Sequence, residues 1–146
     1  MSRLTLIEKS FYLKKTEAFQ ELDLDLALAI ANKAEELIFE KSELIFSLNQ
    51  EAHRLYIILE GNVLITDERE KKLTTLYQYD YFGDESLFSQ KPRMYNAVAE
   101  TKVKLLTISR THLVEIILES PNIALCLLRD YAQSTPFRNR FKEEKQ

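Results

Sequence analysis

One stretch of the sequence, from Tyr81 to Ala99, holds residue types that together could bind an anion. It contains one of the two glycines of the chain, Gly83, and an arginine that follows a proline, Arg93. The run between them, Asp84–Phe88, is long enough for one helical turn. A glycine that opens such a turn leaves backbone N–H groups free at the positive end of the helix dipole. Arg93 could return to this place and offer its planar guanidinium to a phosphate, so the spacing predicts an anion-binding turn.

The polar residues also allow other interpretations, which the sequence leaves open. Arg93 could be a surface arginine that pairs with Asp84 or Glu85, an arrangement that contributes little stability. His53 and His112 are isolated, so neither indicates a metal site or a catalytic pair. The sequence has no nucleophile motif, no phosphate-loop lysine motif and no zinc-ligand spacing. We therefore expect a chain that is not an enzyme and that carries no metal or resident cofactor.

The composition is typical of a globular protein and excludes several classes. The 146 residues are 45% hydrophobic and 29% charged, and the net charge of −3 argues against a general nucleic-acid binder. A single cysteine, Cys126, rules out an intrachain disulfide and fits a reducing compartment. We find neither a signal peptide nor an apolar run of roughly 20 residues. We expect one domain over residues 1–146, located in the cytoplasm, with no membrane segment and no direct contact with nucleic acid.

Helical periodicity marks both ends of the chain. The predicted helices cover residues 2–15, 22–37, 111–120 and 121–133. Asp23 or Asp25 could cap the second helix, and Ser109 is a suitable N-cap for the third. Pro121 favours the first turn of the last helix, which Pro136 should end. The charged tail, residues 136–146, is expected to fray.

The middle of the chain is predicted to be a sheet. Short runs of branched and aromatic residues, separated by polar clusters, predict strands at Leu37–Glu40, Glu43–Ser47, Arg54–Leu59, Asn62–Thr66, Lys72–Tyr77, Asn96–Glu100 and Lys102–Ser109. With so few glycines, Asn, Asp and Ser must form many of the turns. We predict a mainly β, α+β fold: an antiparallel jelly-roll barrel with a short helix in the anion-binding turn. Its parts would be a helical segment over about 1–36, a β-roll over about 37–109 and C-terminal helices over about 110–135.

This order of elements, with several local motifs, resembles the cyclic-nucleotide-binding domain found in protein kinase A regulatory subunits, catabolite-activator-type regulators and nucleotide-gated channels. The residues that carry the resemblance are Leu55–Ile58 with Gly61, Phe82–Leu87 with Pro92 and Arg93, Ala99, Val103–Leu106, Ile108–Arg110 and Leu113. The resemblance as a whole covers roughly residues 19–131. The segment from Gly83 to Arg93 matches the phosphate-binding cassette of that family in the order and approximate spacing of its residues.

The resemblance implies roles for individual residues. Arg93 would pair with the cyclic phosphate, and the backbone N–H groups of Ser86 and Met94 would bind its oxygens. Asp84 would accept a hydrogen bond from the ribose 2′-hydroxyl, and Gly83 would allow the tight turn. The implied nucleotide-binding residues are Gly83, Asp84, Glu85, Ser86, Arg93, Met94 and Asn96, and the implied lid residues over the base are Leu127, Leu128 and Tyr131.

The sequence also departs from the pattern of that family. Asp84 is one methylene shorter than the usual glutamate, Met94 replaces a small residue, and Asn96 stands where threonine is common. Further departures are Ser42, Asn49 and Ala52 in place of glycines and His53 in place of an aspartate. The ribose contact through Asp84 would then be lost or made through water.

Two functions of different classes follow. The first is a non-catalytic sensor that binds a cyclic nucleotide, with cyclic AMP expected ahead of cyclic GMP, and signals by rearranging its C-terminal helix. The second is a ligand-free domain of the same fold that acts in assembly, with a protein partner or as a homodimer. A transcription regulator would need a helix-turn-helix after the sensor, and only about ten residues follow Pro136. That third interpretation therefore requires a longer chain.

Overall fold

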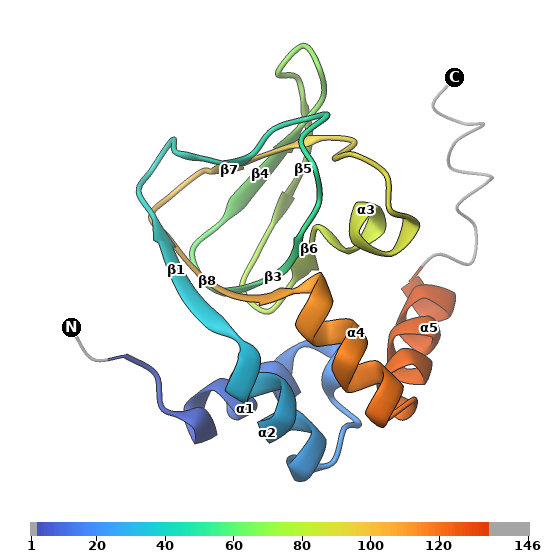
Figure 1. Ribbon diagram of the computed structural model, residues 1–146. Helices are drawn as coiled ribbons and strands as arrows, with labels where there is room; N and C mark the ends of the chain where they lie inside the picture. The colour runs from blue at the N-terminus through green and yellow to red at the C-terminus, as the bar shows by residue number, and fades with distance from the viewer. Residues whose placement is uncertain (1–2, 135–146) are drawn as a thin grey trace.

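Two antiparallel sheets with helices at one end make up the fold of residues 3–134, the part of the chain that this computed structural model describes (Figure 1). The strands are β1 (Glu35–Phe39), β2 (Leu44–Phe46), β3 (Arg54–Glu60), β4 (Val63–Thr66), β5 (Lys72–Leu76), β6 (Tyr81–Phe82), β7 (Asn96–Ala99) and β8 (Val103–Ser109). The helices are α1 (Leu6–Lys15), the short 3-10 helix η1 (Glu17–Phe19), α2 (Leu24–Lys33), α3 (Asp84–Ser89), α4 (Arg110–Glu119) and α5 (Asn122–Ser134). The predicted mainly β fold with flanking helices is confirmed.

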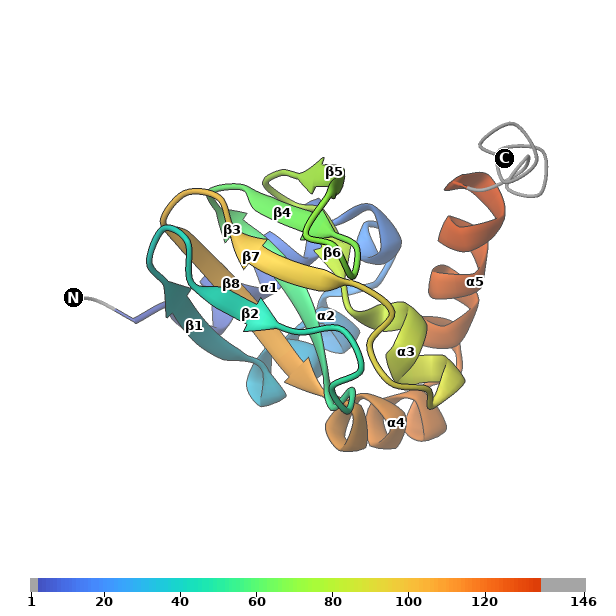
Figure 2. The ribbon, with the colours of Figure 1, turned by 90° about the horizontal axis from the view of Figure 1, so that it is seen from above.

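Each sheet has four strands, and the two sheets enclose one of the two cores. Their orders are β1-β8-β3-β6 and β2-β7-β4-β5, with every pair antiparallel (Figure 2). Strand β3 is buried on both faces, and its side chains alternate between the two cores. Tyr56 and Ile58 point into the core between the sheets, whereas Leu55, Ile57 and Leu59 join the core formed with the helices. The cassette helix α3 therefore lies beside a strand that touches both cores.

Helix α2 is shorter than the sequence predicts. Asp23 caps it, with its Oδ1 accepting the Leu26 N–H at 2.9 Å, but the helix ends at Lys33 rather than near residue 36. Ala34 is extended, with φ −84° and ψ 143°, and Glu35 begins β1 opposite Thr107 of β8. Pairing with β8 satisfies backbone groups that a longer helix would otherwise bond internally, so tertiary structure overrides the local helix preference.

Non-glycine residues form several turns in the left-handed region. Ser42 and Asn49, at two positions where the sequence lacks expected glycines, have φ of 75° and 72°. Small polar side chains tolerate this region better than bulky ones. The Asn49 N–H also donates to the Arg93 carbonyl at 2.7 Å, so this turn supports the end of the cassette.

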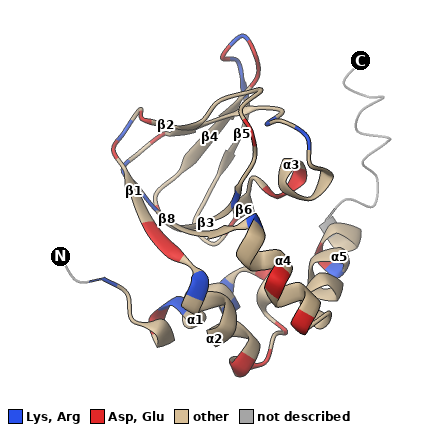
Figure 3. Cartoon of the chain, viewed as in Figure 1, with Lys and Arg blue, Asp and Glu red and all other residues tan. Residues whose placement is uncertain are grey.

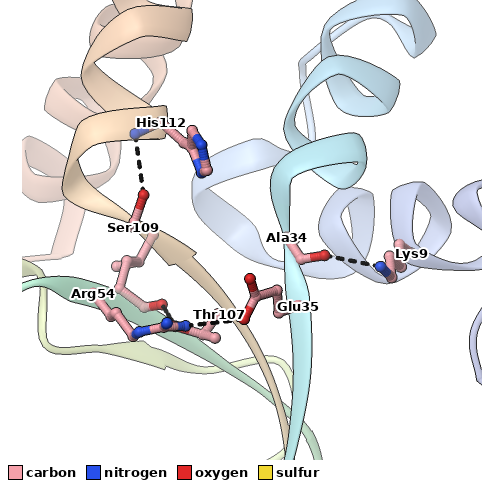
Figure 4. A network of polar contacts seen from close by, with 8 residues as sticks. Lys9, Ala34, Glu35, Arg54, Thr107, Ser109 and His112 are labelled. Carbon is pink, nitrogen blue, oxygen red and sulfur yellow. Dashed lines mark hydrogen bonds and ion pairs between the residues drawn. The ribbon is translucent and has the colours of Figure 1, made fainter.

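Polar contacts join the helices to the sheet on the side of β3 and β8 (Figure 4). Lys9 of α1 donates to the Ala34 carbonyl at 2.8 Å, just before β1 begins. Arg54 of β3 lies 3.4 Å from the Glu35 carboxylate of β1. The contact with Glu35 ties the side chain of Arg54 to β1 at the start of β3, and the backbone carbonyl of Arg54 also takes part in the candidate site.

Ser109 provides a direct test of the local helix signal. Its hydroxyl accepts the His112 N–H at 3.1 Å, which confirms it as the N-cap of α4. We expect Ser109→Ala to lower the free energy of unfolding by about 1 kcal/mol, because one N-terminal donor of α4 loses its partner. Urea denaturation measures this effect, with Thr111→Ala in the first turn of α4 as the control. An unchanged midpoint for Ser109→Ala would contradict the capping role.

The C-terminal helices turn sharply on each other. Within residues 3–134, no single helix is long and apolar enough to cross a membrane, and α4 and α5 reach that length and composition only as a pair bent by 110°. The predicted stop at Pro136 and the charged tail of residues 136–146 lie outside the described residues.

Candidate functional site

Gly83 shapes the start of α3. Its φ is 82°, in the region where an L side chain is strained, and it is the N-cap residue of the helix. A Cβ at this position would lie 2.8 Å from Nη1 of Arg93 and 3.2 Å from the Arg54 carbonyl oxygen. Glycine is therefore required both for the backbone conformation and for the close approach of the Arg93 guanidinium.

Arg93 is buried beside this turn and not on the surface, with only 3% of its area exposed. Its Nη1 donates to the Gly83 carbonyl at 2.6 Å, and its Nη2 donates to the Arg54 carbonyl at 2.8 Å. No ion pair among residues 3–134 joins it to Asp84 or Glu85. The structure thus rejects the alternative of a surface arginine paired across the cassette.

The third nitrogen of the guanidinium, Nε, has no acceptor. Arg93 Nε is buried and lacks a hydrogen-bond partner within the described part of the chain. The guanidinium carbon lies 4.1 Å from the centre of the Phe46 ring, a cation–π contact that covers one face of the group. Burial lowers the pKa of Arg93 from its ordinary value. A buried cation with an unsatisfied donor is a site that an anion would stabilise.

An aromatic cluster fills the interior next to Arg93. Phe46 lies 5.8 Å from Tyr56, 6.0 Å from Phe82 and 5.5 Å from Tyr95, measured between ring centres. Tyr56 and Phe82 are stacked with centres 5.1 Å apart. These rings come from strands of both sheets and from the residue before β7, so the position of Arg93 depends on correct assembly of the whole roll.

Tyr95 is a site residue that sequence reasoning missed. Its hydroxyl accepts the Gly83 N–H at 3.0 Å and donates to the Glu85 carboxylate at 2.8 Å. Burial, followed by the Glu85 charge, raises the pKa of Tyr95, so the hydroxyl remains a donor at neutral pH. The only sequence signal for Tyr95 as a site residue was its position two residues after Arg93. Its contacts with Gly83 and Glu85 form only because the folded chain returns to the start of α3.

Asp84 is a buried carboxylate at the start of α3, with 3% of its area exposed. Its Oδ2 accepts a hydrogen bond from the Tyr131 hydroxyl of α5. Burial and the neighbouring Glu85 charge raise the pKa of Asp84 to about 6, against the lowering effect of the Tyr131 hydrogen bond. The carboxylate therefore changes its charge just below neutral pH.

A second hydrogen bond joins α5 to the same region, and here α5 supplies the acceptor instead of the donor. The Tyr81 hydroxyl of β6 donates to Oδ2 of Asp130, the neighbour of Tyr131 on α5. We call the two tyrosine–aspartate contacts, Tyr131 to Asp84 and Tyr81 to Asp130, the clasp. Because each side contributes one donor and one acceptor, the clasp ties the C-terminal helix to the cassette.

The other predicted site residues are placed differently. Ser86 is buried, and its hydroxyl donates to the Pro92 carbonyl at 3.0 Å, whereas Met94 is 57% exposed. Asn96 is held by backbone groups: its Oδ1 accepts the Leu48 N–H at 2.8 Å and its Nδ2 donates to the Asp67 carbonyl at 2.9 Å. The side chain of Asn96 thus already has partners on both sides.

Of the three predicted lid residues, one reaches the cassette. Tyr131 contacts Asp84 through the clasp. Leu127 is 4% exposed and packs in the core formed by the helices and the outer face of β3 and β8, whereas Leu128 is 61% exposed. The helical period explains the difference, because neighbouring residues on a helix point to different faces.

Comparison with known proteins identifies the fold and the family. A family model described as "Cyclic nucleotide-binding domain" matches residues 36–120. A CRP-like cAMP-activated global transcriptional regulator of Mycobacterium tuberculosis is 30% identical over 125 residues, which cover 83% of this chain and 56% of the regulator. A cAMP-dependent protein kinase regulatory subunit of Dictyostelium discoideum is 26% identical over 106 residues, which cover 68% of this chain and 32% of the subunit.

A solved structure shows the same arrangement of strands and helices. The N-terminal domain of a transcriptional regulator from Streptomyces coelicolor A3(2) superposes with a TM-score of 0.74 at 26% identity, covering 91% of this chain and 95% of that domain. The chain therefore spans only about half, or less, of the two curated relatives, but almost all of this isolated domain.

Proposed function

This chain belongs to the cyclic nucleotide-binding domain family, whose members are regulatory and non-catalytic, and from that premise we propose that it binds cyclic AMP at the cassette. The proposal assigns phosphate binding to Arg93 and ribose binding to Asp84. It rests mainly on one observation, the buried and unpaired Nε of Arg93. A phosphate oxygen would supply the missing acceptor and offset the desolvation of the guanidinium.

The ribose contact can coexist with the clasp. A carboxylate offers about four lone-pair positions on its two oxygens, and Tyr131 uses Oδ2 of Asp84. A ribose hydroxyl could donate to the other oxygen. Nucleotide binding would then change the charge and hydrogen bonding of the residue to which α5 is attached. We propose this link between Asp84 and Tyr131 as the route by which the C-terminal helix responds to ligand.

The remaining predicted site residues take supporting roles in this proposal. The backbone N–H groups of Ser86 and Met94 would face the phosphate, and Glu85 would position Tyr95 next to the turn. Asn96 would stabilise the strand behind the cassette, because both ends of its amide bind backbone groups. Residues 1–146 would form one regulatory domain whose output requires a protein partner or a second copy.

A ligand-free assembly domain is the second candidate, and one observation favours it. Two of the three nitrogens of the Arg93 guanidinium already donate to backbone carbonyls, at Gly83 and Arg54, and Phe46 covers a face of the group. A cassette that supplies acceptors for two of the three guanidinium nitrogens of its arginine can be stable without ligand. In that case the surface, and not the cassette, would carry the function.

Titration with nucleotides separates the two candidates. We expect cyclic AMP to raise the melting temperature in a saturable manner, because ligand that binds only the folded state stabilises it by mass action. Cyclic GMP tests base preference, and 5′-AMP is the control because it carries the same base and ribose without the cyclic phosphate. A melting temperature unchanged by millimolar cyclic AMP and cyclic GMP would contradict nucleotide binding and leave the assembly domain.

A further inference from the structure

Arg93 is enclosed by its neighbours, which bears on how an anion could reach it. The guanidinium carbon lies 4.1 Å from the centre of the Phe46 ring and 5.8 Å from that of the Tyr56 ring. Nη1 and Nη2 donate to the carbonyls of Gly83 and Arg54, and Nε is itself buried. Only 3% of the residue is exposed. A phosphate oxygen can therefore contact Nε only after one of these neighbours, or a residue that holds them, has moved.

Most of the surroundings of Arg93 are fixed by backbone pairing or by the core. The Arg93 N–H donates to the Gln50 carbonyl at 2.8 Å, and the Arg93 carbonyl accepts the Asn49 N–H at 2.7 Å. Tyr95 packs on Phe46, with ring centres 5.5 Å apart, but it is only partly buried. The other three rings of the aromatic cluster are buried in the core between the sheets. Tyr95 is therefore the ring of this cluster that can swing outward with the least loss of core packing.

The hydroxyl of Tyr95 fastens this ring to the cassette at two points. It accepts the Gly83 N–H at 3.0 Å and donates to the Glu85 carboxylate at 2.8 Å. Glu85 is one of the two acidic residues of α3 and is exposed (Figure 3). Gly83 is held at both of its backbone polar groups, its N–H by Tyr95 and its carbonyl by Arg93. One hydroxyl therefore joins the movable ring to the residue that the arginine binds.

We propose that the Tyr95 hydroxyl is a latch, which keeps the cassette closed around Arg93 until nucleotide displaces it. This inference rests on the proposed function and concerns the regulation of the same site. A ligand that binds only the open form has an apparent affinity that is lowered by the fraction of molecules that are open. The two hydrogen bonds of the latch stabilise the closed form and are broken in the open form. The latch therefore sets the nucleotide concentration to which the cassette responds.

Tyr95→Phe tests the latch, because it removes the hydroxyl and keeps the ring that packs on Phe46. We expect cyclic AMP to bind this variant roughly three- to tenfold more tightly than wild type in calorimetry, since one typical net hydrogen bond corresponds to a change of that size.

Exchange of the Gly83 amide hydrogen is a readout that needs no nucleotide. The chain has two glycines, so labelling with ¹⁵N-glycine gives two backbone amide signals, those of Gly61 and Gly83. The Gly83 amide should exchange several-fold faster in Tyr95→Phe than in wild type, because it loses its acceptor. The amide of Gly61, in the turn between β3 and β4, should exchange at the wild-type rate.

The matched control is Tyr77→Phe, which removes the hydroxyl of an exposed tyrosine outside the cassette and should change neither measurement. Wild-type exchange of the Gly83 amide in Tyr95→Phe, or a cyclic AMP affinity no higher than that of wild type, would overturn the latch. Equal binding by both proteins would overturn the latch alone, whereas absence of binding by both would overturn the proposed function together with the latch. Binding by Tyr95→Phe alone would support the latch and show that it holds the wild-type cassette closed.

Discussion

Arg93→Lys is expected to weaken cyclic AMP binding by roughly 10- to 100-fold. Lysine keeps the positive charge but lacks the planar fork that can bind backbone carbonyls and a phosphate at the same time. A charged hydrogen bond contributes about 1.5–3 kcal/mol, which is the basis of this estimate. Calorimetry on wild type and variant measures the effect. Retained affinity in Arg93→Lys would exclude Arg93 as the phosphate-binding residue.

The same substitution should also destabilise the protein without ligand. Arg93 donates to the carbonyls of Gly83 and Arg54 and packs on Phe46, and a lysine cannot restore all three contacts. We expect the free energy of unfolding to fall by about 2–4 kcal/mol, because buried backbone acceptors lose their partner. Arg69→Lys in the exposed β4–β5 turn is the matched control and should change neither property. Wild-type stability in Arg93→Lys would contradict the structural role of the arginine.

Asp84→Asn is expected to stabilise the ligand-free protein at neutral pH. The pKa of Asp84 is raised to about 6, first by burial and then by the Glu85 charge. The folded state therefore binds the proton more tightly than the unfolded state, and stability falls as pH rises from about 4 to about 6. One pKa unit corresponds to about 1.4 kcal/mol, so the ionised carboxylate costs on the order of 3 kcal/mol at pH 7. Asparagine removes that charge while its amide oxygen can still accept from Tyr131.

Urea denaturation from pH 4 to 8 tests this expectation as a difference between variant and wild type. The difference should be small at pH 4 and reach its full size above pH 6. Taking the difference is necessary because Glu8 and Asp67, whose pKa values are lowered by hydrogen bonds, act on acid stability in the opposite direction. Glu68→Gln, in the exposed β4–β5 turn, serves as the control for a lost surface charge. A variant that is less stable than wild type at pH 7 would show that the Asp84 charge supports the fold.

The Asp84 variant also separates stability from ligand recognition. The proposed ribose contact predicts that Asp84→Asn binds cyclic AMP more weakly even though its free form is more stable, because a neutral amide is a weaker acceptor than a carboxylate. A gain in stability with a loss of affinity is typical of a residue kept for binding and not for folding.

The sequence by itself determined the class of fold and the position of the cassette. Alternating apolar residues, the caps Asp23 and Ser109, and the spacing from Gly83 to Arg93 are local patterns, and local patterns encode strand faces, helix starts and tight turns. These predictions agree with the structure because side-chain alternation and helix capping depend mainly on neighbours in the chain. The same logic failed at Lys33, where pairing with a distant strand ended the helix early.

Only the tertiary structure decided what the cassette residues contact. Arg93 reaches the carbonyl of Arg54, 39 residues away, and Tyr131 reaches Asp84 across 47 residues. The two-residue strand β6 is too short to show a period, and it is defined by its pairing with β3. Such contacts depend on how sheets and helices pack, and no periodicity in the chain records them. Packing thus buried Arg93, the arginine that the sequence places in an anion-binding turn, and it decided which backbone carbonyls the guanidinium contacts.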